Sequence, residues 1–285
     1  MKAYKGNFQI LSVILIALMF IGSLWDYQIS QAIFNIENPI AVFLAAYGQM
    51  PASLMMSIGG TLLIVGSEKK LGIGTILQVL VGIVFNAFGL FMASHEPTMY
   101  YPNASFMMVV IINIVLFVCV NALILRLLNT GDKKQLRNYG WFLIFIVFFQ
   151  ILLINGIKVL WGRPRMRLIA SNPDATFQNW WIIGSDLKDK LMPTGVISEE
   201  FKSFPSGHTA SAACIFGLCI LPYLNTSLTK YKNGFFWSCV GITLVIAFSR
   251  LVMGAHFLTD VTMGFTVFVV VFIVGHQLFY SDKKI

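Results

Sequence analysis

Charged residues are scarce in this sequence, and long stretches contain none. Of its 285 residues only 11% are Asp, Glu, Lys or Arg, whereas 57% are hydrophobic. A soluble globular domain ordinarily carries about 25% charged residues. The shortage of charge argues against a soluble domain and predicts an integral membrane protein.

Cysteine is also sparse, and its placement gives no sign of a metal or redox site. All four cysteines lie within apolar segments, and none shows the spacing of metal ligands: Cys119, Cys214, Cys219 and Cys239. We interpret them as small packing residues. The sequence also lacks internal repeats and low-complexity tracts.

Long apolar runs dominate instead. A transmembrane helix needs about 20 apolar residues, and eight runs qualify, at approximately 8–25, 40–66, 72–93, 105–128, 140–160, 208–224, 235–250 and 257–280. The first run lacks the small-x-small cleavage pattern of a signal peptide, so we interpret it as a retained span. We predict an all-α polytopic bundle of about eight transmembrane helices.

The distribution of charge predicts the orientation of these spans. With a cytoplasmic N-terminus, the cytoplasmic segments hold twelve Lys and Arg against three acidic residues, and the other side holds eight against nine. The positive-inside rule then predicts that both termini are cytoplasmic. The basic side faces anionic lipid headgroups, so the net charge of +8 is no sign of nucleic acid binding.

Three short clusters hold most of the reactive side chains, and each borders a predicted span. They are Lys158 with Arg163 and Arg165, then Ser206-Gly207-His208, then Arg250 with His256 and Asp260. Span counting places the end of spans 5 and 7 and the start of spans 6 and 8 on the same side. We expect all three clusters to meet on the extracytoplasmic face.

The third cluster suits a nucleophile. His256 and Asp260 are four residues apart, so they share one face if a helix begins there. A carboxylate that accepts the proton of one ring nitrogen fixes the tautomer and leaves the other nitrogen free to attack.

The other two clusters suit an anion. A helix that starts after Pro205 presents unpaired N–H groups around Ser206 and Gly207, and His208 there is placed to protonate a leaving alkoxide. Arginine and lysine bind phosphate. Taken alone, the Lys158 cluster is better explained as snorkelling cations at a helix end.

These residues resemble the three-part signature of the type 2 phosphatidic acid phosphatase superfamily. The second part is complete at Pro205-Ser206-Gly207-His208, and the third at Ser249-Arg250, His256 and Asp260. The first part, Lys-(six residues)-Arg-Pro, matches at Lys158 and Arg165, but Met166 replaces the proline. Arg163-Pro164 supplies an Arg-Pro pair two residues early, so Arg163 competes with Arg165 as the phosphate ligand. The resemblance covers about 158–260.

The resemblance implies a reaction and a set of roles. His256 attacks phosphorus and forms a phosphohistidine, His208 protonates the leaving group, and Asp260 orients His256. The phosphate is held by Lys158, Arg165 or Arg163, Ser206, Gly207 and Arg250. No metal or other cofactor is implied. The expected substrate is a membrane lipid phosphate at the outer leaflet of a bacterial plasma membrane; the oligomeric state is left open.

Three alternatives remain at this point. A phosphohistidine can pass its phosphate to an alcohol instead of water, a soluble sugar phosphate can be the substrate, and the scaffold can bind lipid phosphate without turnover.

Residues 131–285 form the expected phosphatase core, whereas 1–130 contain four spans without a recognisable site. His95-Glu96, in the predicted loop after the third span, is a minor candidate for substrate contact. The long connection 161–205 suggests a functional or mobile loop, with Trp180 and Trp181 either at the headgroup interface or packed within the loop.

Overall fold

The computed structural model describes residues 4–68, 70 and 72–280, and within these ranges the regular structure is entirely helical. Eight helical segments there are long and apolar enough to cross a membrane, as predicted. The predicted charge asymmetry rests in part on residues outside the described ranges, namely Lys2, Lys69, Asp282, Lys283 and Lys284.

The first five spans are built from six long or medium helices. They are α1 (Lys5–Ile33), α2 (Pro39–Tyr47) with α3 (Met50–Val65), α4 (Ile73–Tyr100), α5 (Phe106–Leu128) and α6 (Lys133–Trp161). The last three are α9 (Gly207–Ala213) with the 3-10 helix η4 (Cys214–Ile220) and α10 (Leu221–Leu224), then η5 (Thr226–Tyr231) with α11 (Lys232–Val252), then α12 (Leu258–Tyr280).

Several helices extend beyond the predicted apolar runs, among them α6 and α4. The Asp132 side chain caps α6 by accepting from the Lys134 and Gln135 N–H groups at 2.9 and 3.2 Å, so this helix starts at Lys133 instead of 140. The helix α4 continues past 93 through His95-Glu96 to Tyr100, so these residues lie in a helix and not in a loop.

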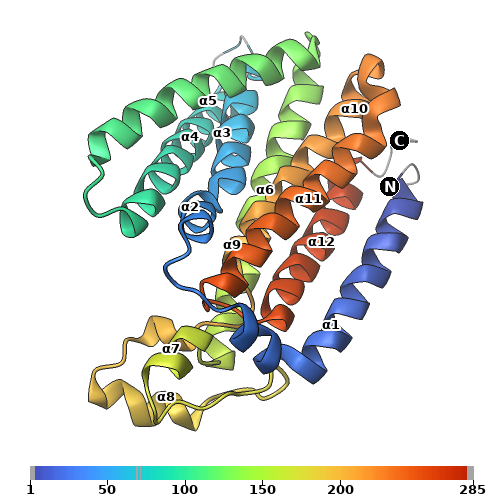
Figure 1. Ribbon diagram of the computed structural model, residues 1–285. Helices are drawn as coiled ribbons and strands as arrows, with labels where there is room; N and C mark the ends of the chain where they lie inside the picture. The colour runs from blue at the N-terminus through green and yellow to red at the C-terminus, as the bar shows by residue number, and fades with distance from the viewer. Residues whose placement is uncertain (1–3, 69, 71, 281–285) are drawn as a thin grey trace.

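The bundle has α6 near its centre (Figure 1). α1 packs against α12 and α11 on one side, whereas α3 packs against α6 and carries α4 and α5 on the other. Glycines allow the close contacts of α3, since a Cβ at Gly59 would lie 3.0 Å from the Gly140 carbonyl oxygen of α6. Large apolar side chains remain exposed along α1, α4 and α5, among them Val13 at 67% and Val84 at 62%. In a bilayer this surface faces lipid.

The connection between α6 and α9 has structure of its own. It contains α7 (Met166–Ser171), α8 (Asp186–Leu191), η2 (Met192–Thr194) and η3 (Ser198–Phe201), closed around a small core of Leu168, Ala175, Leu191 and Phe201. Trp180 packs locally, because its ring stacks on Phe204 and its Nε1 donates to Ser23 Oγ at 2.9 Å. Its neighbour Trp181 is 52% exposed.

This connection caps one end of the bundle. α7 and α8 lie there, whereas the start of α1 and the end of α12 lie at the opposite end (Figure 1). Two of the three sequence clusters flank this connection. The turn of the third cluster contacts it, because the Arg167 N–H donates to the Gly254 carbonyl at 3.0 Å. The fold therefore brings all three clusters to this end of the bundle.

Candidate active site

A cavity of about 650 Å³ lies beneath the capping connection. Its wall is formed by the ends of α4, α6 and α11, by the start of α9 and by the turn before α12. Six of the nine predicted site residues line it: Lys158, Arg165, Gly207, His208, Arg250 and His256. The three sequence clusters therefore meet in one place.

His256 lies in the turn between α11 and α12 and is 1% exposed. Its Nδ1 lies 2.5 Å from the carbonyl oxygen of Ser203. A carbonyl oxygen can only accept, so Nδ1 carries the proton and Nε2 keeps its lone pair. The tautomer is that of a nucleophile.

Asp260 does not form the hydrogen bond to His256 that the spacing predicted. The carboxylate is 3.9 Å from Nδ1, because α12 begins at Leu258 and His256 lies before the helix. Asp260 Oδ2 instead accepts from Ser203 Oγ at 2.5 Å and from the Phe257 N–H at 2.7 Å. Asp260 holds the two segments that flank His256.

His208 occupies the first turn of α9. Ser206 is the N-cap of this helix, and its Oγ accepts from the Thr209 N–H and hydroxyl at 3.3 and 3.0 Å. The Ser206 side chain is thus turned into the helix cap and away from the cavity lining. A Cβ at Gly207 would lie 3.9 Å from Lys158 Nζ, so the start of α9 and the end of α6 face each other closely.

Cations converge on the same space. Lys158 closes α6 and donates to the Lys202 carbonyl at 3.0 Å, Arg165 pairs with Glu199 at 2.9 Å, and Arg250 is 2% exposed. The Nε atoms of Arg165 and Arg250 are buried and have no hydrogen-bond partner in the part of the chain that the structure describes. Buried unpaired donors beside a third cation make a site for an anion.

The surroundings also set the protonation of His256. Burial, reinforced by the nearby charges of Lys158, Arg165, Arg250 and His208, lowers the pKa of His256 well below the ordinary imidazole value. The unprotonated imidazole is therefore the stable form of His256 at neutral pH.

Comparison with known proteins agrees with this arrangement. The family model of the PAP2 superfamily matches residues 139–284, just over half of the chain. The chain belongs to this superfamily. The matched region starts within α6, so α1 to α5 of this PAP2 protein lie before it.

A curated relative shares part of the matched region. Phosphatidylglycerophosphatase B of Bacillus subtilis (strain 168) is 32% identical over 83 residues, which are 27% of this chain and 39% of the relative. The similarity thus spans well under half of the relative's length. No solved structure matches the chain.

The two competing arginines of this PAP2 protein have different surroundings. Arg165 lines the cavity, whereas Arg163 is fully buried and absent from the cavity lining. The Arg163 guanidinium forms ion pairs with Asp26 and Asp260 and donates to Thr259 Oγ1 at 2.9 Å. Its side chain is occupied by a buried charge network behind His256.

Asp26 comes from α1, a helix that the sequence analysis did not connect with the site. The helix is broken at Trp25, with φ −133° and ψ 18°, and the next residue turns its carboxylate toward the start of α12. There Asp26 accepts from the Thr259 N–H at 3.0 Å and from Arg163 Nη2 at 2.9 Å. The only hint in the sequence was an acidic residue at the end of an apolar run.

Residues 1–130 also reach the cavity through α4. Six of its residues line the wall: Phe88, Met92, His95, Glu96, Met99 and Tyr100. Glu96 Oε1 lies 3.1 Å from His208 Nε2, an ion-pair distance without hydrogen-bond alignment. Tyr100 accepts from Arg250 Nη1 at 3.1 Å. The sequence analysis predicted only that His95-Glu96 is a minor candidate for substrate contact.

Metal-ligating side chains do not gather here. No group of three or more His, Cys, Asp or Glu within residues 4–68, 70 and 72–280 has the arrangement of a metal site.

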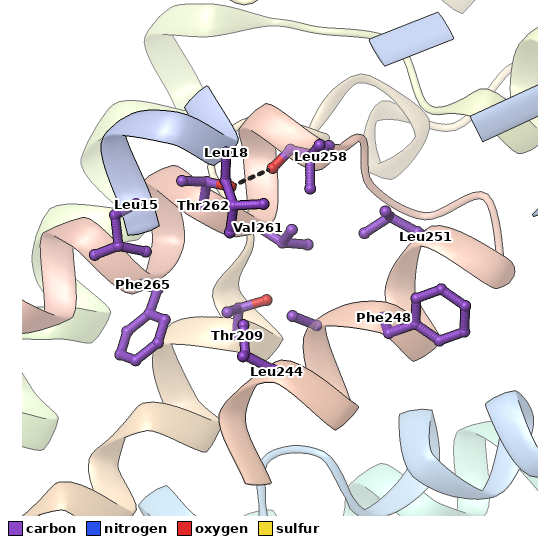
Figure 2. Close-up of a pocket in the computed structure, with 11 residues that line it drawn as sticks. Leu15, Leu18, Thr209, Leu244, Phe248, Leu251, Leu258, Val261, Thr262 and Phe265 are labelled. Carbon is purple, nitrogen blue, oxygen red and sulfur yellow. Dashed lines mark hydrogen bonds between the residues drawn. The ribbon is translucent and has the colours of Figure 1, made fainter. Parts of the chain in front are cut away.

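A second, apolar pocket of about 270 Å³ lies on the other side of the start of α9. Side chains of α1, α9, α11 and α12 converge on it, among them Leu15, Thr209, Leu244 and Phe265 (Figure 2). The pocket also contains the hydroxyl of Thr262, which donates to the Leu258 carbonyl within α12 at 2.7 Å. No charged residue lines this pocket.

Proposed function

We propose that this protein is a membrane phosphatase that removes phosphate from a lipid phosphate through a phosphohistidine, without a metal. The observation that carries the proposal is the convergence of the signature imidazoles on one cavity with the signature cations, namely His208, His256, Lys158, Arg165 and Arg250. Membership of the PAP2 superfamily supports the reaction class, and the name of the Bacillus relative supports a lipid substrate.

In the proposed first step His256 Nε2 attacks phosphorus. An N–P bond forms while the P–O bond to the leaving alcohol breaks, and His208 gives its proton to the departing oxygen. In the second step water attacks phosphorus, His208 takes a proton from it, and the N–P bond breaks to release phosphate and free His256.

The charge that develops on the phosphoryl oxygens is stabilised by Lys158, Arg165, Arg250 and the N–H groups at the start of α9. Between the two competing arginines, the surroundings favour Arg165, because Arg163 already pairs with two carboxylates. Asp260 and Ser206 contribute by holding the turns that carry His256 and His208.

The composition of the cavity wall favours a lipid. Its cations sit at helix ends, and next to them α4 and α6 supply apolar residues such as Phe88, Met92 and Ile154. A phosphate headgroup and the first part of an apolar chain fit such a wall. By the positive-inside rule the cavity opens on the extracytoplasmic side.

A substrate panel tests the proposal. Purified protein in detergent receives phosphatidic acid, phosphatidylglycerol phosphate, undecaprenyl pyrophosphate and a sugar phosphate, with and without EDTA. We expect phosphate release from at least one lipid, unchanged by EDTA, and a loss of at least about 10³-fold in His256→Ala. The matched control is His276→Ala, since His276 lies in α12 and does not line the cavity.

The outcomes separate the alternatives. Undiminished release by His256→Ala contradicts the mechanism, and phosphate found on an added alcohol instead of in solution identifies a transferase. Release from the sugar phosphate alone identifies a soluble substrate. Intact spheroplasts should consume lipid phosphate added to their outer leaflet; consumption only after permeabilisation would reverse the orientation.

A further inference from the structure

The last turn of α4 contacts two residues of the signature clusters. Glu96 lies 3.1 Å from His208 Nε2, and Tyr100 accepts from Arg250 Nη1 at 3.1 Å. The two residues are four apart, so they project from the same face of α4. Because α4 precedes the region that the PAP2 family model matches, these contacts come from outside the matched region.

The position of this turn is fixed by α5. Pro97 has no N–H, so the Ala93 carbonyl of α4 loses its helical partner. Asn113 of α5 donates its side-chain Nδ2 to that carbonyl at 3.0 Å and to Ser94 Oγ at 3.1 Å. Asn113 is 2% exposed, and in apolar surroundings an unpaired carbonyl is costly. The α4–α5 hairpin is therefore braced next to Glu96.

Charged groups approach His208 from four elements. Arg250 of α11, Lys158 of α6 and the His256 ring are cationic or able to become so, whereas Glu96 of α4 is anionic. Burial and the cations both disfavour a protonated imidazole, and Glu96, a carboxylate at ion-pair distance, opposes them. Glu96 is 19% exposed and His208 is 14% exposed, so water screens this pair only in part.

A general acid must hold its proton when the substrate arrives. We propose that Glu96 is a positioning residue, which supplies the counter-charge that keeps His208 protonated, and that the α4–α5 hairpin holds it in place. This inference rests on the proposed function, in which His208 is the acid. The contact lacks hydrogen-bond alignment, and such catalytic contacts commonly tighten when substrate binds.

The kinetic test compares Glu96→Gln, which removes the charge, with Glu96→Asp, which keeps it. We expect the basic limb of the kcat–pH profile of Glu96→Gln to lie about one pH unit lower than in wild type. At pH values above this limb kcat then falls about tenfold, whereas at acidic pH kcat stays near the wild-type value. KM stays equal or falls, because an anionic substrate meets one carboxylate fewer. Glu96→Asp restores most of the profile.

The matched control is Glu37→Gln. Glu37 is exposed, lies next to the segment that bonds to the end of α11, and does not line the cavity. Its removal should leave the profile unchanged, which separates a specific counter-charge from a general change in net charge.

A second measurement does not depend on turnover. The chain has four histidines, so histidine-labelled protein in micelles gives few NMR signals, and His208→Ala identifies the signal of interest. The His208 titration should move to lower pH in Glu96→Gln. If the His208 titration does not move and the pH profiles of Glu96→Gln and wild type superimpose, the inference is overturned. A higher kcat in Glu96→Gln would also overturn it, because Glu96 would then be blocking the phosphate site. A moved titration in a protein that hydrolyses no phosphate would contradict the proposed function alone.

Discussion

Adjacent residues of one helix line two very different cavities. Gly207 and His208 face the charged cavity, and Thr209 faces the apolar pocket. The difference comes from the elements opposite α9. On one side the ends of α4, α6 and α11 and the start of α7 present cations and a carboxylate. On the other side α1, α11 and α12 present aliphatic and aromatic side chains. The chemistry of the site thus depends on where helices end, since charged side chains are tolerated at those ends.

The largest expected effect separates Arg165, which lines the charged cavity, from Arg163, which is buried behind it and lines neither cavity. Arg165→Ala removes a donor from the charged cavity, and we expect kcat/KM to fall about 10²- to 10³-fold with little change in thermal stability. Arg163→Met leaves Asp26 and Asp260 buried without their partner, which should destabilise the fold by about 3–5 kcal/mol. Lipid phosphatase kinetics and thermal melting in detergent check the pair. Equal loss of stability in both variants would show that Arg165 is structural too.

A smaller effect concerns pH. In the proposed mechanism His256 attacks in its unprotonated form, and its pKa is lowered by burial and by neighbouring cations. Activity should therefore persist as the pH falls below the ordinary imidazole pKa. The acid limb of kcat/KM, measured between about pH 4 and 8, should lie well below 6.5. A limb at or above that value would mean that the cations do not act on His256.

The smallest effect is expected in the apolar pocket. Ala247 is 5% exposed and lines it, so Ala247→Leu fills part of its volume. We expect turnover within about twofold of wild type and a stability change of at most about 2 kcal/mol. The matched variant in the charged cavity is Ile151→Trp, which should raise KM. A similar rise in KM for Ala247→Leu would make the apolar pocket part of the substrate site.

The sequence predicted the spans and the clusters well, because both depend on local signals. Apolar runs give the eight helices directly, and the spacing of His208, Arg250 and His256 marks residues that share a cavity. The partner of His256 was predicted incorrectly. The spacing to Asp260 suggested a helical pair, but the helix begins two residues later and the acceptor is the Ser203 carbonyl, a main-chain group that has no signature of its own.

Long-range pairs were also beyond the sequence. Asp26 reaches Arg163 across 137 positions, and Glu96 reaches His208 across the boundary of the PAP2 match. Each is a single acidic residue beside an apolar run, and such residues are common at the ends of membrane helices. Only the packing of α1 and α4 distinguishes them.

The buried charge network around Arg163, formed with Asp26 and Asp260, has a consequence for biosynthesis. Its two carboxylates come from α1 and α12, so a chain that enters the membrane from its N-terminus supplies Asp26 long before Asp260. The turn that carries His256 directly precedes α12. Until α12 has entered the membrane, Arg163 therefore lacks one of its two carboxylates, and the turn of the proposed nucleophile lacks the helix that follows it. The proposed active site is thereby completed only after α12 has been inserted.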